Sequence, residues 1–310
     1  MTVPPSYNFS RYLAAKKSVD DRALNKTVWE SLACAVASYP VEDRLRVLEI
    51  GAGIGTMVER TLDWGLLTRA TYLALDAEQT NISEASSRLP SWASDNGYTV
   101  ENVARNHIRV MGKDQDLLVK LETADVFEFL ARELPNSKWD VLIANAFLDL
   151  IDVPSTLPAL LSLLKPGGLF YFTITFDGAT IIQPEIDRAF DAQIEALYHE
   201  TMDRRVIGGK PSGDSRTGRH FFDQVRSAGA TLIEAGASDW VVFAGPDGYR
   251  GDEAYFLHFI IHTVGSALEG QPALDQERLA WWVRERHTQI DQGRLVYIAH
   301  QMDFLGRVSG

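Results

Sequence analysis

A glycine stands at every second position from Gly51 to Gly55. This run directly follows the apolar stretch 46–50 and precedes a helical pattern at 56–65. Glycine adopts positive φ angles and has no Cβ to block a ligand, and a helix N-terminus presents free N–H groups. This pattern predicts a turn that binds a nucleotide-like ligand. Thr56 stands where the dinucleotide fingerprint G-x-G-x-x-G has its third glycine, so NAD is disfavoured, and a plain tight turn is the alternative.

An acidic residue, Asp76, ends the next apolar stretch at 71–76. It lies about 20 residues beyond the glycine turn, the spacing at which a carboxylate accepts the ribose hydroxyls of a bound nucleoside. A helix N-cap or a solvated strand end is the alternative for Asp76 on its own. Together with the glycine turn, Asp76 favours a nucleoside site.

The elements that must position these groups alternate between short apolar runs and helical periods. Helices are expected at 22–38, 56–65, 78–90, 126–133 and 154–164, and strands at 46–50, 71–76, 117–123, 140–145 and 169–174. Strands separated by helices predict a parallel sheet covered on both faces. Further along, a helix is expected at 217–228 and strands at 231–243 and 295–304. The prediction is a doubly wound α/β fold, a Rossmann-like seven-stranded, mostly parallel sheet with a C-terminal antiparallel strand and inserted helical lid segments.

The domain organisation follows from this alternation. We expect an N-terminal helical cap at 1–40, a ligand-binding Rossmann-like core at 41–176 and a lid insertion at 177–216. Residues 217–310 complete the core and contain a helical insertion at about 250–292. In an open α/β sheet, ligands bind at the carboxyl ends of the strands, where both insertions would roof the site.

Composition narrows the function classes. The chain has 310 residues, a formal net charge of -12 and a single cysteine, Cys34, so internal disulfides and Cys-rich zinc sites are excluded. Lys and Arg are scattered rather than clustered, which disfavours a nucleic-acid partner. No basic leader or membrane-length apolar run is present, so we expect a cytoplasmic protein with no membrane partner, either monomer or homodimer. His258 and His262 are four apart without companion ligands, so no metal is predicted.

The motifs resemble those of the class I S-adenosylmethionine (SAM)-dependent methyltransferases of the small-molecule type. The first motif of that family resembles 49–55, the acidic second resembles 75–76, and the adenine-contacting segment resembles 124–126. The fourth motif resembles 140–147, and the segment before strand five resembles 164–169. These elements stand in family order and spacing over about residues 45–175.

The resemblance implies S-adenosyl-L-methionine as cofactor and S-adenosyl-L-homocysteine (SAH) as product. The resemblance implies that Glu49 contacts the amino group of SAM and that Asp76 binds its ribose. It further implies that Asp125 and the Val126 amide contact adenine and that Asn145 lies near the methyl group. Asp125 as a helix cap and Asn145 as a satisfied strand-end group are the alternatives. The complete set of expected cofactor residues is Tyr12, Arg22, Glu49, Gly51, Ala52, Gly53, Gly55, Thr56, Asp76, Ala77, Asp125, Val126, Asn145 and Ala146.

Catalysis needs mainly an in-line approach of the nucleophile to the methyl carbon, so a general base is optional. Where many small-molecule methyltransferases have a histidine after the fourth motif, this chain has Asp149, so Asp149 and, in the lid, His199 are the catalytic candidates. Lid arginines favour an anionic acceptor, because guanidinium binds carboxylate or phosphate bidentately, and a solvated surface ion pair is the alternative for any one of them. Expected acceptor-binding residues are Tyr198, Arg204, Arg216, His220 and Trp240.

The predicted function is transfer of the methyl group to an O, N or C nucleophile of a small molecule. An aminopropyltransferase that uses decarboxylated SAM is one alternative, which Asp149 and Asp152 keep open. A non-catalytic methyltransferase-like binding or scaffold protein is the other, and the intact cofactor motifs disfavour it.

Overall fold

The computed structural model describes residues 4, 6–39, 44–134, 139–207 and 209–310. At its centre lie five parallel strands in the spatial order β7, β6, β1, β2, β5. Their bounds are Leu45–Ile50 for β1, Arg69–Asp76 for β2, Asp116–Thr123 for β5, Trp139–Asn145 for β6 and Leu164–Gln183 for β7. The order reverses direction at β1, which is a topological switch point where open α/β sheets bind ligands. The expected parallel core is confirmed.

Antiparallel strands extend the sheet at both edges. Beside β7 lie β12 (Val296–Val308) and then β10 (Ala230–Ala237), and the short β11 (Trp240–Val242) also pairs with β12. At the other edge β5 pairs with β4 (His107–Met111), which pairs with β3 (Thr99–Ala104). Ten strands of the described residues thus form one sheet, not seven. The β3–β4 hairpin escaped prediction because β3 is mostly exposed and so has no apolar alternation to reveal it.

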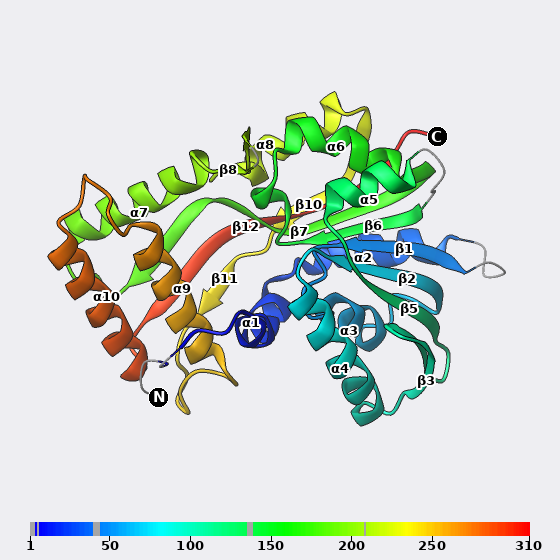
Figure 1. Cartoon of the computed structure of the whole chain (residues 1–310), viewed down its shortest axis with the longest axis horizontal. Helices are drawn as coiled ribbons and strands as arrows, with labels where there is room; N and C mark the ends of the chain where they lie inside the picture. The colour runs from blue at the N-terminus through cyan, green and yellow to red at the C-terminus, as the bar shows by residue number, and fades with distance from the viewer. Residues whose placement is uncertain (1–3, 5, 40–43, 135–138, 208) are drawn as a thin grey trace.

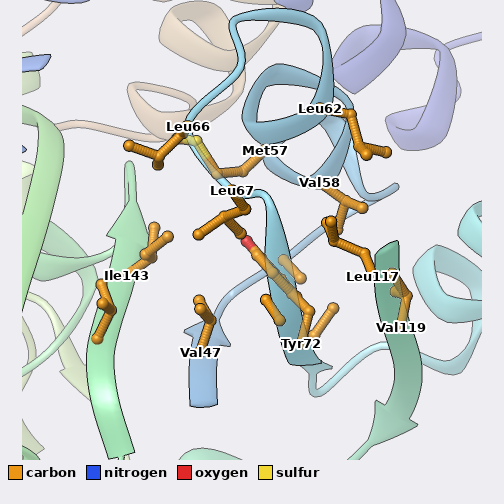
Figure 2. Packing of buried hydrophobic residues seen from close by; sticks show 14 of the residues in the cluster. Val47, Met57, Val58, Leu62, Leu66, Leu67, Tyr72, Leu117, Val119 and Ile143 are labelled. Atoms are coloured by element: carbon orange, nitrogen blue, oxygen red, sulfur yellow. The ribbon is translucent and has the colours of Figure 1, made fainter. Parts of the chain in front are cut away.

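Helices cover both faces of the sheet (Figure 1). On one face lie α2 (Lys26–Ala37), α3 (Thr56–Asp63) and α4 (Gln79–Asp95), whose apolar side chains pack on those of β1, β2 and β5. Figure 2 shows this core, in which Met57, Val58 and Leu62 of α3 approach the buried Tyr72 and Leu117 of the sheet. On the opposite face lie α5 (Val126–Glu133), α6 (Val153–Ser162) and α8 (Thr217–Ser227). The result is a three-layer α/β sandwich.

Two long strands carry a second body of helices beyond the sandwich. β7 and β12 pair along most of their length, and around their far ends lie α7 (Arg188–Asp203), α9 (Glu253–Ala267) and α10 (Gln276–Asp291). A separate buried cluster joins these helices to β11 and β12. The segment 177–183, predicted as part of a polar lid, instead continues β7, because its apolar residues pair with β12. The remaining short elements are the helical turn η1 (Leu148–Leu150) and the hairpin of β8 (Val206–Ile207) and β9 (Lys210–Pro211).

The N-terminal region folds as two helices, whereas one helix at 22–38 was predicted. α1 (Phe9–Ala23) ends where Leu24 adopts extended ψ, and the side chain of Asn25 then caps α2 by accepting from the N–H of Val28. α1 lies between the sandwich and α9 (Figure 1). The predicted boundary between cap and core at 40–41 lies outside the described residues, as do residues 1–3 and 5 of the cap.

No helix among the described residues combines the length and the apolarity needed to span a lipid bilayer.

Candidate active site

A cavity of about 530 Å³ lies at the carboxyl ends of the parallel strands. Its lining combines the loops after β1, β2, β5 and β6 with side chains from α1, α7, α9, β7, β11 and β12. Among the residues expected from the sequence, those that line it are Tyr12, Glu49, Gly51, Ala52, Gly53, Thr56, Asp76, Ala77, Asp125, Val126, Asn145, Ala146, Asp149, Tyr198 and Trp240. Its size is within the range of small-ligand pockets.

The glycine turn forms one wall of the cavity. Gly51 and Gly53 have φ angles of 66° and 55°, in the left-handed region that favours glycine. A Cβ on Gly51 would approach the ring of Phe147 to 2.8 Å, so a side chain there would be strained and crowded. Gly55, also at positive φ, does not line the cavity: a Cβ there would meet Leu89 at 2.9 Å, so this glycine allows α3 to pack on α4.

Asp76 ties the glycine turn to the end of β2. Its Oδ2 accepts the N–H of Gly53 at 2.7 Å, and its Oδ1 accepts the N–H of Glu78 at 2.9 Å and the side-chain amide of Asn81 at 3.1 Å. A carboxylate has about four acceptor positions. The three protein bonds therefore fix the orientation of Asp76 and leave acceptor capacity towards the cavity.

Glu49 is a buried carboxyl group at the floor of the turn, only 1% exposed. It accepts a 2.8 Å hydrogen bond from the hydroxyl of Tyr72. Burial raises its pKa to about 8, and the bond from Tyr72 and the charge of Arg60 only partly oppose this. A cation beside this carboxyl group would favour its ionised form.

Two charged residues of α1, Lys16 and Asp20, enter the cavity beside the turn. The ammonium of Lys16 lies 2.6 Å from Asp20 Oδ2, and both side chains are almost fully buried. The indole N–H of Trp240 donates to Asp20 Oδ1 at 2.9 Å, and Lys16 lies 5.0 Å from the centre of the Trp240 ring. Burial lowers the pKa of Lys16, and Asp20 opposes this. Asp20 was not expected from the sequence, although its i,i+4 spacing from Lys16 was the available signal.

Asp125 and Asn145 each hydrogen-bond within the protein and also line the cavity. Asp125 caps α5 by accepting the N–H groups of Phe127 and Glu128 at 2.8 and 3.3 Å. Asn145 accepts from the hydroxyl of Thr173 at 2.9 Å, and its amide points to Asp20 at 3.5 Å. The structural alternatives considered for both residues therefore hold alongside their position in the cavity wall.

Asp149 lies on η1, at the border between the turn region and the lid helices. Its Oδ1 is buried and has no hydrogen-bond partner among the described residues. Burial raises the pKa of Asp149, while the nearby charges of Arg205 and Lys16 lower it. The guanidinium of Arg205 donates to the main-chain carbonyl of Asp149 at 3.4 Å. Such a carboxyl group is able to accept a proton from a ligand.

Two of the residues expected from the sequence, Arg22 and His199, are not part of the cavity lining. Arg22 does not line the cavity but makes a bidentate pair with the buried Glu253 of α9, at 2.5 and 3.0 Å. His199 is also outside the lining and shares a 3.1 Å hydrogen bond with Thr180, which does line it. Burial lowers the pKa of His199.

Three other lid residues expected from the sequence, Arg204, Arg216 and His220, do not line the cavity. Arg204 is exposed and pairs with Glu200, and His220 pairs with Asp214 at 3.2 Å. Arg216 is exposed at the start of α8. The buried positions Phe190 and Ile194 set the inward face of α7, and its next turn brings Tyr198, not Arg204, to the cavity. Sequence proximity to the lid did not reveal this helical phase.

Within the part of the chain that the structure describes, no three His, Cys, Asp or Glu side chains are grouped as a metal site would require. His258 faces His287 of α10 at 2.8 Å between their Nδ1 atoms. His262 instead stacks on Tyr7. These histidines connect α9, α10 and the N-terminal segment.

No protein-family model matches the sequence, and no curated protein matches it. Among solved structures, a SAM-dependent methyltransferase from Thiobacillus denitrificans in complex with SAH is similar, with 15% identity, 99% of both chains covered and a TM-score of 0.46. A phosphoethanolamine N-methyltransferase from Haemonchus contortus is 13% identical, covering 99% of this chain and 61% of its own, with a TM-score of 0.41. A cyclopropane synthase from Mycobacterium tuberculosis is 11% identical, covering 90% and 83%, with a TM-score of 0.42. At such identities and TM-scores, these similarities assign no function to this chain.

Proposed function

We propose that the protein transfers the methyl group of SAM to a small-molecule acceptor bound in the same cavity. One observation carries this proposal: the glycine turn, Asp76, Glu49 and Lys16 all line one cavity at the switch point of the sheet. Their charges complement an amino acid joined to a nucleoside. Glu49 suits an ammonium group, Lys16 a carboxylate and Asp76 a ribose.

The residues present fit this cofactor along its whole length. The turn at Gly51 and Gly53 offers backbone close to a ligand, and the N-terminus of α5 beside Asp125 and Val126 offers a pocket wall for a purine. The buried Glu49 has no protein cation in hydrogen-bonding contact among the described residues, so a ligand ammonium would complete its environment. The cofactor supplies an electrophilic methyl group on a sulfonium.

The chain's own contribution is to position the acceptor and to exclude water. α1 closes the cavity from one side, held to α9 by Arg11–Asp252 and Arg22–Glu253. Asp149, which lines the cavity, would receive a proton from the nucleophile. Cytoplasmic location and a monomeric or homodimeric state remain part of this proposal.

Lys16 separates methyl transfer from the aminopropyl alternative. Decarboxylated SAM lacks the carboxylate that Lys16 would bind, so a site built for it would have no use for an ammonium there. Asp20 and Trp240 hold Lys16 in place from inside the cavity. The position of Lys16 therefore favours SAM itself.

Calorimetric titration with SAM, SAH, decarboxylated SAM and NADH tests the proposal. We expect micromolar binding of SAM and SAH, about tenfold weaker binding of decarboxylated SAM, and no binding of NADH. Tighter binding of decarboxylated SAM would support aminopropyl transfer. Absence of binding by all four would contradict an enzyme of this class and favour the scaffold alternative.

A further inference from the structure

We propose that the methyl acceptor is an amine on an apolar body, held between an aromatic wall and the carboxylate of Asp149. This inference rests on the proposed function, because it assigns the acceptor class for the same cavity. It departs from the anionic acceptor that the lid arginines favoured in the sequence. The wall, the unpartnered acceptor atoms and the distribution of positive charge each support it.

The aromatic wall consists of six rings from six different elements. They are Tyr12, Phe176, Tyr198, Trp240, Phe259 and Tyr297, and all line the cavity. Tyr12 stacks on Phe259 with ring centres 4.2 Å apart, and Trp240 and Tyr297 lie 6.5 Å apart. Aromatic faces attract an ammonium group electrostatically and also bury an apolar body. The wall therefore suits a molecule that combines both features.

The unpartnered buried atoms of this region are hydrogen-bond acceptors. Asp149 Oδ1 and Gln301 Oε1 are both buried without a partner, and both residues line the cavity. Within the described residues, none of the buried side-chain nitrogen donors or hydroxyls left without a partner lines it. A buried acceptor without a partner costs about 1–3 kcal/mol. Both oxygens have almost no accessible surface, so a side-chain rotation must turn them to the cavity; a ligand N–H donor then removes this cost, whereas a carboxylate or phosphate adds further acceptors.

Positive charge is scarce on the acceptor side. Of the two cationic residues in the lining, Lys16 is assigned to the carboxylate of the cofactor and is also paired with Asp20 at 2.6 Å. The other, Arg205, donates to the carbonyl of Asp149, whose carboxylate offsets its charge. Arg204 and Arg216 point elsewhere. An anionic acceptor would therefore face a carboxylate and only one guanidinium.

The chemistry at Asp149 balances for an amine. The bound ammonium R–NH₃⁺ gives one proton to the Asp149 carboxylate, which leaves a lone pair on nitrogen. The N–CH₃ bond forms with this pair as the S–CH₃ bond breaks, and the electrons of the broken bond remain on sulfur. The products are R–NH₂⁺–CH₃, SAH and protonated Asp149, which then releases its proton to water. Burial, which raises the pKa of Asp149, makes the carboxylate a better proton acceptor.

Three probes of nearly equal shape test the inference: 2-phenylethylamine, 2-phenylethanol and phenylacetate. Each is titrated by calorimetry into the full-length protein saturated with SAH. We expect the amine to bind about tenfold more tightly than the alcohol or the carboxylate. In Asp149→Asn, amine affinity should fall about tenfold while alcohol affinity changes less than about twofold. A preference for phenylacetate or 2-phenylethanol, or no binding of any probe, would overturn the inference.

Two further variants keep the test decisive. Glu195→Gln removes a carboxylate that contacts the N–H of Thr180 but does not line the cavity, so it should leave all three affinities unchanged. Tyr198→Leu removes one ring and should weaken the amine about fivefold more than the alcohol, which tests the wall even if Asp149→Asn fails to fold. If SAH itself does not bind, the proposed function fails, and the same titrations on the ligand-free protein still decide the amine preference.

Discussion

The two halves of the cavity are built in different ways. Apart from Lys16 of α1, the half assigned to the cofactor comes from the ends of β1, β2, β5 and β6 and the loops that directly follow them, so its residues stand next to sheet strands in the sequence. The acceptor half brings together α1, α7, α9, β11 and β12, from Tyr12 to Gln301. Local motifs therefore define the first half, while long-range packing defines the second. We expect substitutions in the first half to affect SAM binding directly, and those in the second to affect selectivity or closure.

The largest effect is expected from Asp76→Asn. This substitution weakens both the anchoring of the turn through Gly53 and the acceptor positions for ribose hydroxyls. We expect SAH affinity to fall about 100-fold, from the loss of charged hydrogen bonds. Calorimetry on the variant and on Asp223→Asn, an exposed control on α8, gives the comparison. Equal SAH affinity in wild type and Asp76→Asn would contradict the assignment of the cofactor half.

A smaller and more selective effect is expected from Lys16→Met combined with Asp20→Asn. Removing both partners avoids leaving a buried uncompensated charge, because Arg60, which also lies 3.5 Å from Asp20, keeps its 2.6 Å pair with Asp21. SAM affinity should fall about tenfold, while the affinity for decarboxylated SAM should stay within about twofold. The ratio of the two affinities is the readout, because a general loss of stability would lower both together.

The protonation of Glu49 makes the stability of the ligand-free protein depend on pH. Because burial raises its pKa to about 8, Glu49 retains a proton in the folded protein that it loses near pH 4.5 when unfolded. Its contribution to stability is thus fully present below pH 4.5 and is lost as pH rises towards 8. Denaturant unfolding should show this loss in wild type and less of it in Glu49→Gln. Asp303, whose pKa is raised to about 6, also makes stability fall as pH rises, but it does so equally in wild type and in Glu49→Gln. The difference between the two proteins therefore reports the contribution of Glu49.

Binding should reverse the protonation of Glu49. A ligand ammonium beside it favours the carboxylate, so SAH binding at pH 7 should release up to about one proton. Calorimetry in two buffers with different ionisation enthalpies measures this number. Release of the same number of protons by Glu49→Gln would show that another group is responsible.

The smallest effect on SAH affinity is expected from Arg22→Ala, which tests whether the contact between α1 and α9 closes the cavity. Arg22 is exposed and pairs with the buried Glu253, which also accepts from Ser18 at 2.7 Å. We expect the free energy of unfolding to fall by about 3 kcal/mol, because the buried Glu253 is left without its cation, and SAH affinity to change less than about twofold. A tenfold loss of affinity with unchanged stability would instead give Arg22 a direct contact with the cofactor.

The sheet centre was predictable because its strands are continuous apolar runs bounded by turn signals. Val47, Leu73 and Leu142 are buried whichever face they occupy, so the runs at 46–50, 71–76 and 140–145 stand out in the sequence. The β3–β4 hairpin and the extension of β7 were missed. The outer strand of the hairpin is mostly exposed, and the extension depends on pairing with β12, more than 100 residues away.

The candidate site likewise contains residues that the sequence predicted and residues that it did not reveal. Asp76 and Glu49 were predicted because family-like motifs fix their positions next to the strands, and both line the cavity. Asp20 was missed because its importance comes from Trp240, which lies 220 residues away in the sequence. Of the lid residues expected to bind the acceptor, Tyr198 lines the cavity, whereas Arg204 and Arg216 do not, and the sequence did not show which of them face inward.

A crystal structure of the protein with SAH tests the central claim most directly. The account predicts SAH in the cavity between the glycine turn and Asp76, with its amino group at Glu49, its carboxylate at Lys16 and its adenine beside Asp125. SAH bound elsewhere on the surface, or an adenine placed at the aromatic wall of Trp240 and Tyr297, would contradict it.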